Sequence, residues 1–559
     1  MTWDWEQVAP FFAELAERPL NAATVDAWLA DWTSLMDLMD EWHSRLHVAT
    51  TVNTENALAR AALHDFLDNI DPPFKAADQR LKQKLLASGL RPTGFDQPLR
   101  DLAAQAEIFR EENLPIKARL EKLGNQYDEI IGAQSVDWDG ESLTLAQVEA
   151  LLEDPDRNKR ERAWRATMER RLQDRDPINR LWTQLVDGRL ELAKNAGMNS
   201  FIEYQWKDLE RFDYTPADCA RFRDAIAEVV VPAVGRMRER RRAALGVDKL
   251  RPWDTYVDVH GDRPLKPFDD VPGLADGVGR MFASLDGRVA EYYEIMRAER
   301  LLDLDNRPRK APGGYCTSFA MAKRPFIFMN AVGTHDDVQT LLHESGHCFH
   351  VFQGNHLPYY QQHNVPIEFA EVASMAMELL AAPFLHKDRG GFYDDADAAR
   401  ARLQHLEHVL SLWPFMAVVD GFQHWAYKYS EAARHPEECD ATWERLWDQF
   451  AVGVDWSEFD EAKRTGWHRK LHIFLHPFYY VEYGLAQLGA VQVWRNATHD
   501  RHAAIEQYLA ALALGGTQPL PRLFEAAGAR FAFDADTLRE AVDLVEEAMA
   551  DLEKVLAQS

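Results

Sequence analysis

The chain of 559 residues has few cysteines, no excess of basic residues and no long apolar run. Its four cysteines are scattered and cannot form the dense disulfide framework of a small secreted protein, which suits a reducing compartment. Its 63 Lys and Arg face 90 Asp and Glu, and the net charge of -27 disfavours nucleic acid as a partner because phosphates would be repelled. No run approaches the roughly 18 apolar residues of a membrane-spanning helix, and the first residues lack the pattern of a signal peptide. We therefore expect a cytoplasmic protein that binds neither nucleic acid nor membranes.

Helical periodicity dominates the sequence. Hydrophobic residues make up 46% of the chain and charged residues 27%, which is enough for a large core and excludes wholesale disorder. Apolar residues recur three and four positions apart, for example in residues 25–42. At roughly 150 residues per domain, the length indicates three or four domains or one large helical body.

Three stretches interrupt the helical pattern. Residues 135–145 contain an Asp-Gly pair between short alternating runs, which is typical of a β-hairpin. Residues 250–272 are rich in Pro and Asp and predict an irregular connector. Residues 303–330 contain a Gly-Gly turn and end in a predicted strand at 325–330. We therefore expect a small, local sheet content near the middle of the chain.

The segment LLHESGHCFH contains an HExxH motif. His343 and His347 stand one helical turn apart, so both imidazoles can reach one metal ion, and Glu344 lies where such sites keep a general base. Thr334 is a suitable N-cap for this helix, and Gly354 is a suitable stop. The motif in this helical context predicts a zinc site, whereas the alternative is a solvated helix that happens to carry histidines.

The other residues of this helix indicate that one face packs against the core and the opposite face carries the metal site. On a helical projection, His343, His347 and His350 fall opposite a stripe of apolar side chains. Gly346 in the helix interior costs about 1 kcal/mol relative to Ala, which indicates the close approach of another backbone or of a substrate. Cys348 points roughly 100° away from His347, so we interpret it as a packing residue and not as a ligand.

A third ligand would complete a catalytic zinc site with one open position. The helix expected between Pro366 and Pro383 carries three carboxylates in one sector, Glu368, Glu371 and Glu378. Apolar residues surround them, which indicates a buried helix, and buried carboxylates need partners such as a metal and its histidines. A solvated acidic face is the alternative, and spacing alone does not choose among the three.

A second polar and aromatic group lies in residues 472–494. A helix is expected to begin at Pro477, and Tyr479, Tyr480 and Tyr483 then fall within a sector of about 100°. The spacing alone favours an aromatic core stripe over a catalytic role, and buried tyrosine hydroxyls need partners in either case.

The segment HESGHCFH is similar to the HExGHxxH pattern of the M3 peptidase family, which includes thimet oligopeptidase, neurolysin and oligoendopeptidase F. EFAEVASMAMELL resembles the third-ligand helix of that family. Its Glu-Val-Ala-Ser is closer to the oligoendopeptidase F branch than to the Glu-Ala-Pro-Ser of the thimet-like branch. The resemblance is clearest over residues 310–494. It implies that Glu371 completes the site of one zinc ion with His343 and His347, and that Glu378 supports a ligand.

The resemblance also implies roles in substrate binding. His472 and Tyr483 would be catalytic residues that bind the scissile carbonyl, and the second tyrosine stays open between Tyr479 and Tyr480. A strand over residues 326–330 could pair with an extended peptide, although a structural hairpin is the alternative. Three residues before that strand would line the cleft: Gly313, Gly314 and Tyr315.

The sequence predicts a mainly α fold with a small β-sheet next to the HExxH helix, and the resemblance implies a large multi-helix body of two lobes with a deep channel that admits short peptides. We expect an N-terminal helical lobe over residues 1–165 and an M3-like catalytic region over residues 166–559. The predicted function is zinc-dependent cleavage of internal bonds in short unfolded peptides, with Glu344 as the base. The alternatives are a zinc carboxypeptidase or aminopeptidase and a non-catalytic, peptide-binding helical protein. The sequence does not indicate an oligomeric state.

Overall fold

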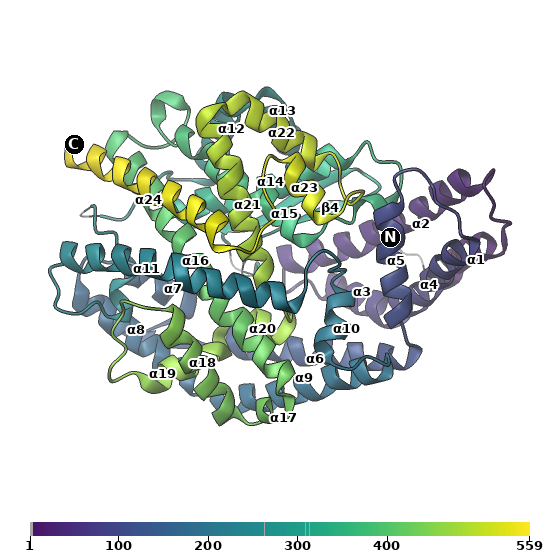
Figure 1. The fold of residues 1–559 in the computed structure, drawn as a ribbon, viewed down its shortest axis with the longest axis horizontal. Helices are drawn as coiled ribbons and strands as arrows, with labels where there is room; N and C mark the ends of the chain where they lie inside the picture. The colour runs from purple at the N-terminus through teal and green to yellow at the C-terminus, as the bar shows by residue number, and fades with distance from the viewer. Residues whose placement is uncertain (1–3, 262, 308, 312, 559) are drawn as a thin grey trace. The chain divides into compact units, whose positions relative to one another are not determined.

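The structure is a computed structural model that describes residues 4–558 except 262, 308 and 312. The described part is mainly helical with two small sheets, which confirms the predicted mainly α fold (Figure 1). No helix in the described ranges has the length and apolar character needed to cross a bilayer. Pro312, which precedes the Gly-Gly pair, lies outside the described residues.

The chain divides into two compact units. Unit 1 comprises residues 1–107, 266–394 and 486–531, and unit 2 comprises residues 108–265, 395–485 and 532–559. Each unit is thus built from separate stretches of sequence. The predicted division into a lobe over residues 1–165 and a catalytic region over residues 166–559 stays a prediction.

The described residues of unit 1 form helices in each of its three stretches of sequence and one sheet. Its helices are α1 (Trp5–Glu17), α2 (Val25–Val52), α3 (Ala57–Asp65), α4 (Asp71–Ser88), α5 (Asp96–Ile108, which ends one residue beyond the unit), α12 (Val271–Leu285), α13 (Gly287–Ala298), α14 (His335–Gly354), α15 (Ile367–Ala381), α22 (Arg501–Leu512) and α23 (Leu520–Ala526). Its strands are β3 (Leu302–Asp305), β4 (Tyr315–Phe319) and β5 (Arg324–Ala331). The helix α21 (Tyr480–His499) begins in unit 2 and continues in unit 1.

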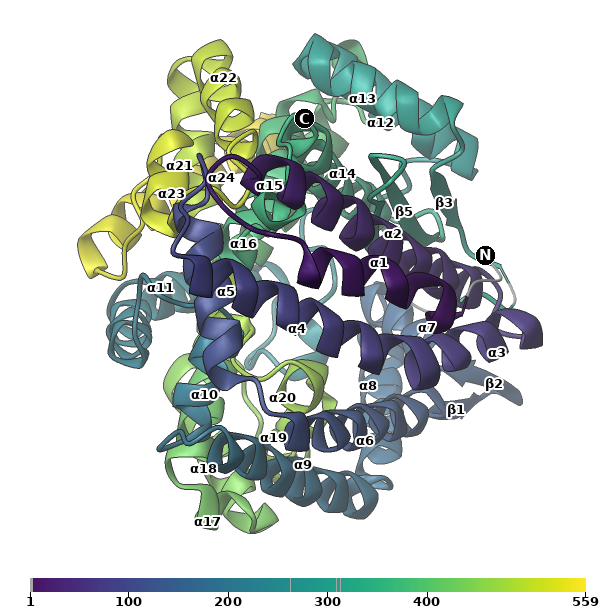
Figure 2. The same ribbon diagram turned by 90° about the vertical axis from the view of Figure 1, so that its right-hand side faces the viewer.

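The three-stranded sheet of unit 1 has the order β3-β5-β4. The strand β5 pairs with β3 in parallel and with β4 antiparallel, so it is the central strand and β4 lies at an edge. The sheet packs against α14, as Figure 2 shows for β5. The predicted strand over residues 325–330 is therefore confirmed. Its antiparallel partner β4 forms the structural hairpin that was the stated alternative, and β3 is a strand that the sequence did not indicate.

The helices α14 and α15 lie side by side (Figure 1). Thr334 caps α14 by accepting a hydrogen bond from the backbone N–H of Asp337, and the helix ends at Gly354, both as predicted. Two residues of its apolar stripe, Leu341 and Phe349, are fully buried. A Cβ atom on Gly346 would lie only 2.5 Å from the carbonyl oxygen of Ala373 on α15. The close approach expected at this glycine is thus the backbone of α15.

Unit 2 is a helical body with one hairpin. Its helices are α6 (Leu114–Gly132), α7 (Leu145–Ala150), α8 (Arg157–Leu172), α9 (Arg175–Asn195), α10 (Phe201–Asp208), α11 (Pro216–Ala244), α16 (Asp395–Lys428), α17 (Ser430–Ala433), α18 (Pro436–Phe450), α19 (Asp460–Arg464), α20 (Leu471–Leu475) and α24 (Ala535–Gln558). The predicted hairpin is present as β1 (Ser135–Trp138) paired antiparallel with β2 (Glu141–Thr144). In the predicted connector over residues 250–272, the described residues before α12 contain one short 3₁₀ turn, Pro252–Asp254.

The predicted start of a helix at Pro477 is wrong. The helix α21 begins at Tyr480, because Phe478 has a left-handed φ of 66° that no α-helix accommodates. Phe478 is fully buried, its N–H donates to the side chain of Gln423, and its carbonyl accepts from Arg211. These tertiary contacts hold the turn and shift the helical phase of the tyrosines that follow.

Candidate active site

Three of the predicted site residues converge in unit 1. His343 and His347 on α14 and Glu371 on α15 each offer one ligand atom, and these atoms all lie within 4.8 Å of one another. The Oε2 atom of Glu371 lies 3.4 Å from Nε2 of His343 and 3.8 Å from Nε2 of His347. Two ligand atoms on a tetrahedral zinc ion, each about 2.1 Å from the metal, are about 3.4 Å apart. The donor set and its spacing therefore fit one zinc ion.

The electrostatics of this cluster favour a cation. Burial lowers the pKa of His343, but hydrogen bonds to Glu371 and Glu378 outweigh it and raise the pKa well above its ordinary value. Burial lowers the pKa of His347 to about 4. Burial raises the pKa of Glu371, yet the hydrogen bond from His343 and the charge on His347 outweigh it and lower that pKa to about 2. The raised pKa of His343 among these carboxylates indicates a place where positive charge is stable.

Neighbouring side chains orient the candidate ligands. Nδ1 of His343 lies 2.7 Å from Oε1 of Glu378, which leaves Nε2 to face the cluster. The hydroxyl of Ser374 lies 3.1 Å from Oε2 of Glu371 and 3.0 Å from its carbonyl oxygen. The buried Tyr508 on α22 donates to the carbonyl oxygen of Ala373 at 2.7 Å. Glu378 thus has the supporting position that the resemblance implied, and the carboxylate of Glu368 lies outside the cluster.

Sequence reasoning missed Ser374 and Tyr508. Ser374 follows Glu371 by three residues, so its place on the same face of the helix was a local signal that could have found it. Tyr508 is 135 residues from its partner, and no local signal indicates such a contact.

Glu344 stands beside the cluster on α14 and is buried. Burial raises the pKa of its carboxyl to about 7, with further contributions from the charges on Glu371 and Glu378. The backbone N–H of Cys316 on β4 points toward this carboxylate and opposes the increase in its pKa. A carboxyl with a pKa near neutrality is suited to accept a proton and to return it.

His350 is a packing residue. It is buried with its ring edge-on to Phe369 at 5.9 Å, and burial lowers its pKa to about 3. Cys348 is fully buried, in agreement with its predicted packing role.

The Gly-Gly segment leads into the edge strand β4. Gly313 has a φ of 93°, a left-handed conformation that favours glycine, and nothing lies within 4 Å of the Cβ position that it leaves open. Its carbonyl oxygen accepts a hydrogen bond from the side chain of Asn330. A Cβ on Gly314 would make only ordinary contacts, the nearest at 3.5 Å. The ring of Tyr315 stacks on Phe328.

The structure corrects one expectation about this sheet. The strand over residues 326–330 cannot pair with a peptide, because it belongs to β5 and both of its edges are occupied by β3 and β4. Among the described residues, β4 has β5 on one side and no paired strand on the other, so its outer edge is the candidate for pairing. The hydroxyl of Tyr315 on β4 lies 2.6 Å from that of Thr51 on α2, a contact that the sequence did not indicate.

The predicted aromatic group lies in unit 2. The hydroxyl of Tyr483 is 3.5 Å from Nε2 of His472, and the His472 ring centroid lies 5.5 Å from that of Tyr479 and 5.0 Å from that of Tyr480. Tyr480 is buried, whereas Tyr479 and Tyr483 are partly exposed. Lys470 covers the ring of Tyr480, with its Nζ atom 4.3 Å from the ring centroid. The structure brings these four residues together within their unit.

Unit 2 also contains a second group with metal-binding side chains, namely Cys219, Asp420 and His424. Here the guanidinium of Arg223 forms an ion pair with the carboxylate of Asp420. The positive charge that Asp420 needs is therefore already supplied by the protein, which makes this group a weaker candidate for a metal than the cluster in unit 1.

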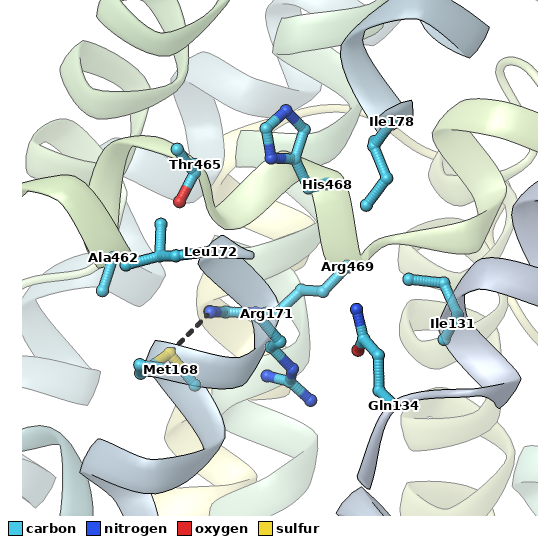
Figure 3. A pocket seen from close by; sticks show the side chains of 10 residues that line it. All are labelled: Ile131, Gln134, Met168, Arg171, Leu172, Ile178, Ala462, Thr465, His468 and Arg469. Atoms are coloured by element: carbon cyan, nitrogen blue, oxygen red, sulfur yellow. Dashed lines mark hydrogen bonds between the residues drawn. The ribbon is translucent and has the colours of Figure 1, made fainter. Parts of the chain in front are cut away.

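A cavity in unit 2 does not involve any predicted site residue (Figure 3). The guanidinium of Arg469 reaches into it and lies 3.8 Å from the sulfur of Met168. Burial lowers the pKa of Arg469 to about 10. The cavity is lined by Ile131, Gln134, Met168, Arg171, Leu172, Ile178, Ala462, Thr465, His468 and Arg469.

A helical body with a buried His₂Glu cluster and an adjacent glutamate is the arrangement of a metallopeptidase. Comparison with known families identifies the chain: the model of peptidase family M3 matches residues 150–543, and that of the M3 N-terminal domain matches residues 1–107. The chain therefore belongs to peptidase family M3.

Relatives of known name are similar over most of the chain. An oligoendopeptidase F homologue of Lactococcus lactis subsp. lactis is 25% identical over 81% of this chain and 73% of the relative. The plasmid oligoendopeptidase F of Lactococcus lactis subsp. cremoris is 24% identical over the same shares. The solved structure of PZ peptidase A with an inhibitor matches with a TM-score of 0.91 and 26% identity, covering 99% of this chain and 98% of that one. These similarities place the chain in the oligoendopeptidase F branch of the family.

Proposed function

We propose that the chain is a zinc-dependent oligoendopeptidase that cleaves internal bonds of short peptides. The observation that carries this proposal is the convergence of His343, His347 and Glu371 beside the buried Glu344. The names of the relatives, oligoendopeptidase F, support the substrate class. The restriction to short unfolded peptides and the cytoplasmic location stay predictions.

His343, His347 and Glu371 would hold the zinc ion, and Glu378 and Ser374 would keep two of these ligands in orientation. Zinc bound at such a site lowers the pKa of water and polarises a carbonyl group. The carboxylate of Glu344 accepts a proton from the attacking water and passes it to the nitrogen of the leaving amine. Its pKa near 7 suits both transfers.

The substrate would be held by main-chain and side-chain groups. The edge of β4 can pair with an extended peptide, and Gly313, Gly314 and Tyr315 would line the binding site there. His472 and Tyr483 would donate hydrogen bonds to the oxyanion that forms at the scissile carbonyl. Tyr479 is the better candidate for the second tyrosine, because Tyr480 is buried under Lys470.

Mass-spectrometric mapping of products tests the proposal. The zinc-loaded chain is incubated with synthetic peptides of graded length and with a folded protein. We expect internal cuts confined to the peptides, and no cleavage by Glu344→Gln. A matched control is Asp336→Asn, the same chemical change at an exposed position on the same helix, which should retain activity. Stepwise trimming from either end would indicate an exopeptidase, and the absence of any cleavage would refute a catalytic role.

A further inference from the structure

Two thiols meet beside the candidate active site. Sγ of Cys316 on β4 lies 3.4 Å from Sγ of Cys348 on α14, and neither residue is in a disulfide. Cys348 is fully buried, whereas Cys316 is partly exposed. Because the sulfurs are already in contact, each is placed to react with the other.

Both cysteines are joined to the proposed catalytic machinery through the backbone. Cys348 directly follows His347 on α14. The N–H of Cys316 points toward the carboxylate of Glu344 and lowers its pKa, so the position of this strand residue affects the proposed base. A covalent link between the two thiols would therefore tie the edge strand to the helix that carries both the base and two ligands.

We propose that Cys316 and Cys348 form a modification site, at which a peroxide or a low-molecular-weight disulfide converts the two thiols into a disulfide and lowers peptidase activity. The effect on activity rests on the proposed function of Glu344, whereas the chemistry of the thiol pair does not. The partly exposed Cys316 is the thiol that an oxidant reaches first.

The reaction is balanced with a peroxide as the oxidant. The sulfur of Cys316 attacks one peroxide oxygen, the O–O bond breaks, and a sulfenic acid and one water form. The sulfur of Cys348 then attacks the sulfur of the sulfenic acid, the S–O bond breaks, and the hydroxyl leaves as a second water with the thiol proton of Cys348. With a low-molecular-weight disulfide, Cys316 forms a mixed disulfide and releases one small thiol, and Cys348 then breaks the mixed disulfide and releases the second. The two thiols lose two electrons in total, and the peroxide is reduced to two waters.

The bond would displace the groups around Glu344. The sulfurs must move from 3.4 Å to about 2 Å apart, and rotation of the two side chains and movement of the strand and the helix together supply this change of more than 1 Å. The N–H of Cys316 shifts with the strand, so its distance and direction to the carboxylate of Glu344 change. Because misplacement of a catalytic group by about 1 Å can cost up to roughly a hundredfold in rate, we expect a loss of at least about tenfold in kcat/KM.

Peptide mapping without reduction tests the site. The full chain is treated with hydrogen peroxide or with oxidised glutathione, digested and analysed by mass spectrometry. We expect a peptide containing Cys316 linked to one containing Cys348, and its separation on addition of dithiothreitol. Cys219 and Cys439 serve as internal controls, because both are buried and should stay reduced. Oxidation of Cys316 alone, or no oxidation of either thiol, would overturn the proposal.

Activity measured in parallel separates this inference from the proposed function. Wild type should lose about tenfold in kcat/KM on oxidation and recover with dithiothreitol. The variants Cys348→Ala and Cys316→Ser should keep their rates under the same treatment. Each removes one thiol of the pair, so the test remains possible if one variant does not fold. An equal loss in both variants, or a linked protein with an unchanged rate, would contradict the effect on activity. A reduced chain that cleaves no peptide would refute the proposed function, while the linked peptide would still establish the modification site.

Discussion

Replacing Gly346 by Ala should weaken metal binding. The new Cβ would lie 2.5 Å from the carbonyl oxygen of Ala373 and 2.6 Å from Cα of Ser374. Ordinary contacts between such atoms are about 3.5 Å, so α14 and α15 must separate by about 1 Å. Both clashing atoms belong to backbone and cannot turn away as a flexible side chain would.

This separation acts directly on the candidate zinc ligands. His343 and His347 move with α14, and Glu371 moves with α15, so the ligand distance of 3.4 Å would increase toward about 4.4 Å. Overpacking costs about 1–3 kcal/mol, of which the better helix propensity of Ala recovers about 1 kcal/mol. We therefore expect folded protein with a zinc affinity reduced by roughly 10–100-fold, the loss seen when the support of a ligand is disturbed.

Competition with a chromogenic chelator measures the zinc affinity of the variant, and circular dichroism measures its helix content. Gly354→Ala is a matched control on the same helix, because nothing lies within 4 Å of its Cβ position. The control should bind zinc as wild type does. Gly346→Ala with an affinity equal to wild type would refute the coupling between helix spacing and the metal site.

Three further predictions concern ligands, stability and the tyrosines. Glu371→Ala should abolish stoichiometric zinc binding, whereas Glu378→Gln should only lower the affinity for zinc by roughly tenfold. Equal zinc contents of the two variants by metal analysis would contradict the ligand assignment. Burial, with the charges on Asp37 and Glu41, raises the pKa of Asp40 from 3.8 to about 6 in the folded state. The stability that its protonated form contributes is complete below pH 3.8 and is lost as pH rises through about 6. The free energy of unfolding of Asp40→Asn relative to wild type, measured in urea, should therefore be higher by about 1 kcal/mol near pH 8 than near pH 5. A difference between the two proteins that does not depend on pH would contradict this. Tyr479→Phe should lower kcat by roughly tenfold or more and Tyr480→Phe should leave it nearly unchanged, whereas the reverse order would assign the role to Tyr480.

Local signals predicted the helix that carries the HExxH motif. Its cap at Thr334, its end at Gly354 and its apolar stripe depend on residues within a few positions of one another, and the structure has all three. Gly346 also predicted a close contact, but the sequence did not indicate which part of the chain makes it. The backbone of α15 reaches that glycine through tertiary packing, which no pattern within α14 encodes.

Tertiary contacts explain where the sequence patterns were insufficient. Pro477 is a favourable first residue of a helix, yet the buried Phe478 has a positive φ, which its hydrogen bonds to Gln423 and Arg211 stabilise. The central place of β5 results from parallel pairing with β3, and the sequence pattern of β5 does not reveal how many partners it has. Ser374 was visible in principle and Tyr508 was not, because only the first lies within one turn of its partner.

The outward direction of the Cys316 N–H also restricts how a peptide can pair with β4, since Ile327 opposite Cys316 donates its own N–H to Leu301 and not to β4. In an antiparallel strand, successive residues point their N–H and C=O groups to opposite edges. Because the N–H of Cys316 faces Glu344 and not β5, Gly314 and Ser318 should face the same outer edge. A peptide on that edge would use the main-chain groups of alternate residues, and its bond nearest to Cys316 would lie beside the proposed base. Peptides that carry one N-methyl group at successive positions test this register. We expect the cleavage rate to decrease when the N-methyl group is at alternate positions, where the peptide N–H donates to β4. An equal cleavage rate for N-methyl groups at all positions would show that main-chain pairing does not hold the substrate.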